Sequence, residues 1–414
     1  KNGFLGIDNK VNFKEKVVVV PFGLEKTVSY GGGTKNGPKE IIKASHQVEL
    51  YDEELHCEPY KKIGIKTLKP FKIQQHIMIQ DLDSNDVINS VPGNLVVITP
   101  DNARKSARYR GALVYASDYE GKITKINLTN MSSDQGNPPI ALYDNYHMFD
   151  SQATEANGRF MFHSMDATIG RKTKKLWLFA GTGDYDRIAD RTKGVQNLLL
   201  GLKDENYPLY KDVDGTIEPT PVRNMDDLTK CKNVTSDKTG ASCPQKADVG
   251  WYVTLKDFRK VTAEPTVGRG LVYFPIYKPS SSVNACSLGD AMICGLDDEC
   301  GTNVSEQMGK NTGSQSKYDC KYVGQGVLSK VIIFAGKIFA NIYGQNEVVV
   351  IDPLTGQIIN NINFSNLLAQ AGVKYDPTTI DVGYVLNGIA YQAKSKTFFI
   401  TGKCWPVMVE VSVK

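Results

Sequence analysis

The chain has 414 residues, of which 41% are hydrophobic and 23% charged, a composition that excludes an intrinsically disordered protein. Its 49 basic and 45 acidic residues leave a formal net charge of +4, too small over this length to favour binding to nucleic acid. No apolar run approaches the roughly 20 residues that cross a bilayer, so we expect no membrane span.

The first predicted unit, residues 1–73, has the pattern of a short α/β segment. A strand is expected over Val17–Pro21, a turn over Gly31–Gly33 and a helix over Pro38–Leu55. Pro38 suits the first helical turn, because its fixed φ fits a helix and its missing N–H has no partner there. The apolar positions that would form one face of this helix are Ile41, Ile42, Val48 and Leu55.

From residue 80 to residue 345 the pattern changes to short strands separated by Gly, Asp, Asn and Ser turns. Clear hairpins are Ala112–Ser117 with Ile123–Leu128, and Val331–Ala335 with Ile338–Ile342. Residues 346–414 continue this pattern more regularly, as separate propeller blades. Such strands predict a mainly β chain, a modified β-propeller with a short α/β segment at its N-terminus.

Most of the eight cysteines lie in polar loops, which is typical of disulfides formed in an oxidising compartment. No pair has the C-x2-C spacing of a zinc site. The histidine nearest in sequence to the loop cysteines, His163, lies far upstream of them, so disulfides are favoured over zinc. We therefore expect an extracellular protein. The predicted disulfide cysteines are Cys231, Cys243, Cys286, Cys294, Cys300 and Cys320.

One short segment offers oxygen atoms in the alternating pattern of a calcium loop. Asp81, Asp83 and Asn85 would supply positions one, three and five. The segment lacks glycine at position six, and a polar surface turn explains the same residues and is favoured. The expected cofactor is therefore none, or calcium at these three residues.

The middle of the chain carries several linked motifs in one order. They are Arg108–Lys122, Leu176–Tyr185, Gly250–Tyr252 and Thr262–Thr266. In this order they resemble the C-terminal propeller domain of type IV pilus tip-associated (PilY-type) adhesins. The resemblance implies a protein at a bacterial pilus tip that serves pilus assembly and surface adhesion, with minor pilins and a surface or host receptor as partners.

The N-terminal stretch is similar to the start of the ureohydrolase family, agmatinase in particular. Val18–Gly23, Ser29–Thr34 and Ala44–Asp52 carry this similarity. That family needs a two-manganese centre built from G-G-D-H, D-A-H-x-D and S-x-D-x-D motifs. None of these motifs occurs in the chain, so ureohydrolase activity is not expected.

The last stretch looks like the end of the glutamine cyclotransferase family, which is itself a propeller. Val349–Gly356, Leu386–Tyr391 and Thr401–Pro406 carry this resemblance. It implies that these segments form pocket walls, with Asn387, Lys403 and Trp405 as the residues an enzyme would use. In that family the acid/base carboxylate is expected earlier, in blades that this chain lacks.

Two functions follow from these resemblances. The favoured interpretation is a non-enzymatic pilus-tip protein without catalytic residues, since its resemblance covers a whole domain. The alternative is a glutamine cyclotransferase-like propeller enzyme that forms N-terminal pyroglutamate. A buried carboxylate with a raised pKa in a closed pocket would favour the enzyme.

Overall fold

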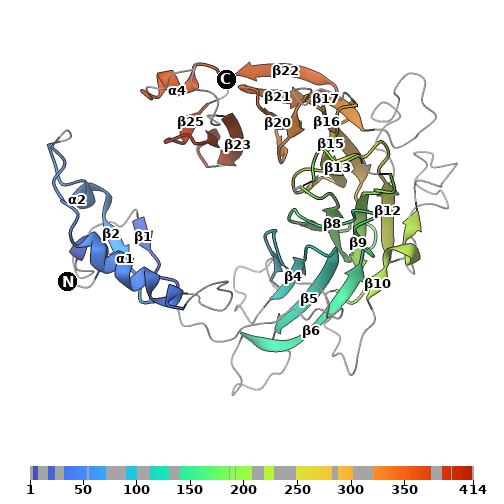
Figure 1. Cartoon of the computed structure of the whole chain (residues 1–414), viewed down its shortest axis with the longest axis horizontal. Helices are drawn as coiled ribbons and strands as arrows, with labels where there is room; N and C mark the ends of the chain where they lie inside the picture. The colour runs from blue at the N-terminus through green and yellow to red at the C-terminus, as the bar shows by residue number, and fades with distance from the viewer. Residues whose placement is uncertain are drawn as a thin grey trace. The chain divides into compact units, whose positions relative to one another are not determined.

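The structure is a computed structural model, and it divides the chain into two compact units, Lys1–Met78 and Ile79–Lys414 (Figure 1). The residues it describes are 3–7, 17–23, 32–53, 56–70, 90–99, 112–129, 140–185, 187–191, 193–207, 219–227, 249–281, 288–301, 320–373, 385–392 and 394–412. Within them, no helix is long and apolar enough to cross a membrane.

The first unit contains a small parallel sheet and short helices. Strand β1 (Val17–Val19) pairs in parallel with β2 (Ile65–Thr67). The helical elements are η1 (Phe4–Gly6), η2 (Thr34–Asn36), α1 (Gly37–Ser45) and α2 (Pro59–Ile63).

Helix α1 begins one residue before the predicted Pro38 but ends earlier than the predicted Leu55. The Ser45 hydroxyl donates to the Ile42 carbonyl and accepts the N–H of Leu5, at 2.6 and 2.8 Å. The last helical turn is thereby tied to η1, and the chain turns away after Ser45.

The second unit is a series of mainly antiparallel sheets that follow one another in chain order (Figure 1). The exceptions are β10 and β11, which pair in parallel with β6 and β12. The first sheet contains β3 (Val96–Ile98), β4 (Leu113–Ser117), β5 (Lys122–Thr129) and β6 (Ile140–Asp150), with β10 (Thr220–Pro221) added beside β6. The second contains β7 (Asp166–Ile169), β8 (Leu176–Gly181), β9 (Leu198–Asp204) and β12 (Gly250–Thr254), with β11 (Asp226–Asp227) beside β12. The short helix η3 (Val222–Asn224) lies between β10 and β11 in sequence.

Three more sheets complete the described part of this unit. The third contains β13 (Lys260–Val261), β14 (Thr266–Gly268), β15 (Leu271–Lys278), β16 (Asp290–Asp297) and β17 (Lys321–Gln325). The fourth contains β18 (Val327–Leu328), β19 (Ile332–Phe334), β20 (Lys337–Tyr343), β21 (Glu347–Ile351) and β22 (Ile358–Asn363). After α4 (Leu367–Gln370), the fifth contains β23 (Val385–Gln392), β24 (Thr397–Lys403) and β25 (Val409–Val411).

The hydrophobic core lies between neighbouring sheets. Each of four clusters of buried side chains joins one sheet to the next, from first to fifth. Trp251 of the second sheet, for example, meets Phe274 of the third edge to face, with ring centroids 6.4 Å apart. Sheets that pack face to face in sequence order are the architecture of a propeller. The prediction of a mainly β, propeller-type fold is confirmed.

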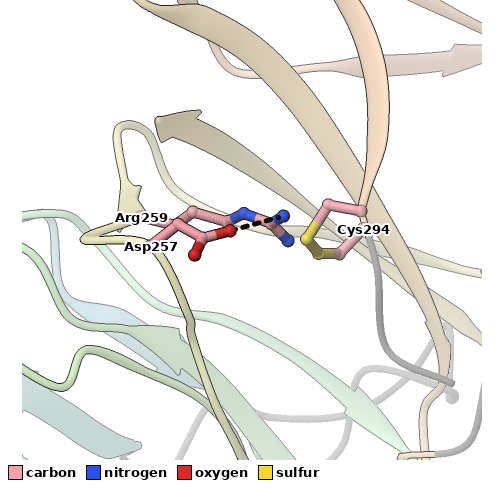
Figure 2. The surroundings of a disulfide bond; sticks show 4 residues. Asp257, Arg259 and Cys294 are labelled. Carbon is pink, nitrogen blue, oxygen red and sulfur yellow. Dashed lines mark hydrogen bonds and ion pairs between the residues drawn. A yellow bond between two sulfur atoms is a disulfide. The ribbon is translucent and has the colours of Figure 1, made fainter. Parts of the chain in front are cut away.

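A disulfide stabilises the third sheet. It joins Cys294 on β16 to Cys320, immediately before β17, with their Cα atoms 4.4 Å apart. Figure 2 shows the Arg259 side chain beside this disulfide, with its guanidinium 3.4 Å from the Asp257 carboxylate.

The remaining predicted disulfide cysteines are only partly described. Cys300 also forms a disulfide, whereas Cys57 and Cys404 are not disulfide-bonded. Cys231, Cys243 and Cys286 lie outside the described residues.

Candidate functional site

Corresponding strands in the sheets of the second unit run in the same direction. The loops that lead into these strands therefore lie at the same end of the unit. In the second, third and fourth sheets a linker leads into a short strand (β7, β14 or β19), and we call these three the first strands. The linker before β7 comes from the first sheet, whereas those before β14 and β19 follow the short strands β13 and β18 of the same sheets. Strand β14 contacts both β7 and β19, so these first strands lie side by side. We call the end of the unit where these linkers lie the linker end.

Polar side chains occupy the linkers just before these first strands. His163 precedes β7, Glu264 precedes β14 and Lys330 precedes β19. We call these three the pre-strand residues. Because they stand at corresponding places in neighbouring sheets, the fold brings them to the same end of the unit.

Hydrogen bonds between sheets hold these linkers in register. The Asp166 carboxylate on β7 accepts the N–H of Val267 on β14 at 2.8 Å. The hydroxyls of Thr262 and Thr266 donate to the carbonyls of Leu328 and Val331 at 3.0 and 2.8 Å. The backbone on both sides of Glu264 is thus attached to the backbone on both sides of Lys330.

Glu264 and Lys330 form an ion pair that joins the third sheet to the fourth. The Glu264 side chain is 21% exposed and that of Lys330 is 52% exposed. The carboxylate is therefore the more enclosed partner, while the ammonium sits on a long side chain that reaches solvent.

The same run of contacts continues into the fifth sheet through Asn341. This fully buried amide accepts the Ser329 hydroxyl at 2.6 Å and donates to the Leu386 carbonyl at 3.2 Å. The next residue, Asn387, is the extra residue of a β-bulge between Leu386 and Gly388, and it is exposed. A bulge turns a side chain out of the regular alternation of a strand, which leaves the Asn387 amide available.

The two other residues that the cyclotransferase resemblance singled out lie nearby on the fifth sheet. Leu386 pairs with Gly402, and the Trp405 indole packs so closely on Gly402 that any side chain there would clash with it. The Trp405 Nε1 is buried without a hydrogen-bond partner. Lys403, the last residue of β24, is exposed. The structure therefore brings Asn387, Lys403 and Trp405 to the linker end.

His163 lies in an aromatic environment at this end. Its ring meets those of Phe162 and Tyr185 edge to face, with centroids 5.5 and 5.7 Å away. Burial lowers the His163 pKa to about 4, so the imidazole is neutral near pH 7. Its Nε2 is buried without a hydrogen-bond partner.

Asp118 is a buried carboxyl in the β4–β5 turn, and only 1% of it is exposed. The N–H of Ser151, where the linker to β7 begins, donates to the Gly121 carbonyl of this turn, so the turn also lies at the linker end. The Asp118 Oδ1 accepts the Lys122 N–H at 2.9 Å, and its Oδ2 has no partner. Burial raises the Asp118 pKa to about 7.

A second carboxyl with a raised pKa lies at the opposite end. Asp298 follows β16, and burial, reinforced by the negative charges of Asp297 and Glu299, raises its pKa to about 6. Of the two, only Asp118 lies at the linker end. It has two of the features that the sequence argument required of an enzyme, burial and a raised pKa, the third being a closed pocket.

No metal centre is formed by the part of the chain that the structure describes, where no three His, Cys, Asp or Glu side chains cluster. The calcium candidates Asp81, Asp83 and Asn85 lie outside that part, so a calcium site there stays a prediction.

The last part of the chain is similar to proteins of one known family. Residues 327–413, which include the fourth and fifth sheets, match the glutamine cyclotransferase family. Glutaminyl-peptide cyclotransferase of Arabidopsis thaliana is 29% identical over 100 residues, 24% of this chain and 30% of that protein. The fold and this match define a propeller-type protein with a glutamine cyclotransferase-like C-terminal part.

A second relative matches a shorter segment. N(1)-aminopropylagmatine ureohydrolase of Synechocystis is 48% identical over 54 residues, 13% of this chain and 18% of that protein. The chain thus spans less than a third of the length of either curated relative.

Among solved structures, Myxococcus xanthus glutaminyl cyclase is similar, with 13% identity and a TM-score of 0.23 over 77% of this chain and 93% of that one. A GH93 α-L-arabinofuranosidase of Fusarium graminearum has 10% identity and a TM-score of 0.32, over 74% and 70% of the two chains.

The expectation of a non-enzymatic pilus-tip adhesin was wrong. The family match and the Arabidopsis relative both belong to glutamine cyclotransferases, which are enzymes, and they support the alternative function. The adhesin resemblance rested on strand and turn motifs such as Leu176–Tyr185, which lie in β8 and the turn after it. Buried strands and glycine turns are required by the architecture, so they indicate a propeller without indicating what it does.

The sequence argument also missed Glu264 and Lys330 as site residues. Their signal was a charged residue just before a very short strand, once in each of two neighbouring sheets. That signal has a meaning only when the strands are known to lie side by side.

Proposed function

We propose that this chain is a propeller enzyme of the glutamine cyclotransferase type, which converts the N-terminal glutamine of a peptide into pyroglutamate. The observation that carries the proposal is the family match over residues 327–413. The matched sheets carry Asn387, Lys403 and Trp405, all at the linker end.

The reaction closes a ring within one substrate. The α-amino nitrogen attacks the side-chain amide carbon, a C–N bond forms, and the bond from that carbon to the amide nitrogen breaks. When the reaction starts from the peptide with a protonated α-amine, the products are the pyroglutamyl peptide and one ammonium ion. The site must therefore bind an amine, donate hydrogen bonds to an amide oxygen that gains negative charge, and exchange protons.

The linker end has groups suited to these tasks. The exposed Asn387 amide is a hydrogen-bond donor for the substrate amide oxygen, and the Trp405 N–H, which is buried without a partner, would be a second donor once substrate binding uncovers it. Asp118, with a pKa of about 7, can both take up and release a proton near neutral pH. Its position in the first sheet makes it a candidate for proton exchange rather than for direct contact with the amide.

The disulfide between Cys294 and Cys320 suits an oxidising compartment. We therefore propose that the enzyme acts on peptides outside the reducing cytosol.

The test is to incubate the purified chain with a short peptide that begins with glutamine and to follow it by mass spectrometry. The expected result is loss of one ammonia from the peptide, faster than spontaneous cyclisation. The same peptide with an acetylated N-terminus should remain unchanged, because its nitrogen is no longer a nucleophile. Conversion at only the spontaneous rate would overturn the proposal.

A further inference from the structure

We propose that Glu264 is the binding site for the free α-ammonium group of the peptide, and that Lys330 occupies this carboxylate until the peptide displaces it. The identity of the ligand rests on the proposed function. The exchange itself rests on the geometry of the pair.

The first observation is that the carboxylate is held more firmly than its partner. Glu264 lies between Thr262 and Thr266, whose hydroxyls attach this linker to the fourth sheet, and the following residue, Pro265, is buried. Lys330 reaches across on a flexible four-carbon side chain that is 52% exposed. The ammonium can therefore leave for solvent while the carboxylate stays in place.

The second observation concerns charge. A partly enclosed carboxylate that loses the ammonium paired with it is destabilised, but replacement of one ammonium by another keeps it paired. A primary amine of the substrate has the same charge and the same three hydrogen-bond donors as the lysine it replaces. An acetylated N-terminus has neither the charge nor the donors, so the exchange selects peptides with a free N-terminus.

The third observation is the position of the pair relative to the fifth sheet. Lys330 adjoins Ser329, which is hydrogen-bonded to Asn341, and Asn341 is bonded to the carbonyl just before Asn387. Binding of the α-ammonium at Glu264 would place the glutamine side chain beside this run of contacts. The amine site and the amide donors would then be supplied by different sheets.

The test measures peptide binding by calorimetry and does not depend on turnover. The probes are a short glutamine-initiated peptide and its N-acetylated form, each titrated into wild type, Glu264→Gln and Lys330→Met. For wild type we expect the free peptide to bind about tenfold or more tightly than the acetylated one, as for a hydrogen bond to a charged group. Glu264→Gln should abolish this preference.

Lys330→Met gives the decisive result, because removing the competitor should make the free peptide bind several-fold more tightly than it binds wild type. If the ion pair had only a structural role, Lys330→Met would not raise the affinity for the free peptide. The matched control is Lys337→Met, an exposed lysine at the first residue of β20, where that strand starts away from the linker end, and it should leave both affinities unchanged.

Two outcomes would overturn the inference: a preference that survives in Glu264→Gln, or no gain in affinity in Lys330→Met. If Glu264→Gln does not fold, the Lys330→Met measurement alone decides. The proposed function can be rejected independently of this inference. A preference for the free amine that depends on Glu264, without release of ammonia, would retain the amine site and reject the cyclotransferase.

Discussion

Trp405 and Asp118 each have a buried polar atom without a hydrogen-bond partner. An unpartnered buried group costs about 1–3 kcal/mol of stability. A protein that keeps such groups at one end of its fold has a reason other than stability to keep them, and in this account the reason is chemistry.

For Trp405, the change to test is Trp405→Phe, which keeps an aromatic ring and removes the indole N–H. If this donor stabilises the substrate amide oxygen, kcat/KM for a glutamine-initiated peptide should fall about 10²-fold or more, the typical cost of one oxyanion donor. Thermal stability should change little, since an unpartnered donor is removed together with some packing.

Tyr391→Phe serves as the control for Trp405→Phe, since it removes a hydroxyl from the part of β23 beyond the linker end, and it should leave kcat/KM unchanged. If kcat/KM were unaltered in Trp405→Phe, the indole N–H would have no part in catalysis.

For Asp118, the prediction concerns pH. The folded protein holds the Asp118 proton with a pKa of about 7, because burial opposes the charge, while the ordinary value is 3.8. Between about pH 4 and pH 7 the folded state therefore binds more protons than the unfolded state, and stability falls as the pH rises through this window. The loss is complete above pH 7 and amounts to at most about 4 kcal/mol.

Asp118→Asn removes this titration, so its melting temperature should exceed that of wild type at pH 8 and should fall less between pH 4 and pH 7. Thermal unfolding at a series of pH values measures both effects. A variant with the same pH profile as wild type would show that Asp118 is ionised throughout.

At the scale of elements, Glu299 connects the third sheet to the β7–β8 turn of the second. Its carboxylate accepts the N–H groups of Lys172 and Thr173, both at 2.8 Å, and the Thr173 hydroxyl at 2.7 Å. Burial raises the Glu299 pKa, but these hydrogen bonds outweigh it, so the pKa lies below its ordinary value of 4.5. The stabilisation is therefore present above about pH 4.5 and is lost as the pH falls through the lowered pKa.

Glu299→Gln should lower the free energy of unfolding by about 2 kcal/mol at pH 7, because a neutral amide accepts fewer and weaker bonds. Urea unfolding at pH 7 measures this loss, and the difference between variant and wild type should shrink toward pH 3. A difference that does not depend on pH would contradict the charged role of Glu299.

The disulfide acts at the same scale, within one sheet. Cys294 and Cys320 are 26 residues apart, and a loop of that length corresponds to about 3.5 kcal/mol of stabilisation in the chain-entropy account. The double variant Cys294→Ala with Cys320→Ala should lose stability of this order in urea unfolding. Wild type under reducing conditions should lose at least as much stability, because the disulfide of Cys300 is reduced as well. Equal stability of the double variant and oxidised wild type would show that the Cys294–Cys320 crosslink contributes nothing.

Sequence reasoning located these elements well where turns define them. The predicted pair Val331–Ala335 and Ile338–Ile342 corresponds to β19 and β20, and the pair Ala112–Ser117 and Ile123–Leu128 to β4 and β5. Local turn chemistry and β-branched residues are enough to specify a hairpin. The predicted helix was too long, because its end depends on contacts of Ser45 with η1, a segment 40 residues away in sequence.

At the scale of the whole molecule, the sequence supported a propeller but not its site. The packing of each sheet on the next follows from apolar strands in series, as the four core clusters confirm. The linker end brings together Glu264, Lys330 and Asn387, which belong to three sheets and are more than 50 residues apart along the chain. Only the order and direction of the sheets make them neighbours.

The architecture also explains why the function was first misjudged. Strand and turn motifs recur in every sheet, so a resemblance over many of them is a resemblance in fold. The shorter match over residues 327–413 includes exposed polar residues and an unpartnered indole. Features of this kind are not required by packing, and they are the better guide to activity.

The most direct test of the central claim is the release of ammonia from a glutamine-initiated peptide by the purified chain, compared with the Trp405→Phe variant at equal concentration. We expect steady release by wild type, equimolar with pyroglutamyl peptide, and a rate about 10²-fold lower for the variant. Release by wild type at only the spontaneous rate of the peptide would contradict the central claim.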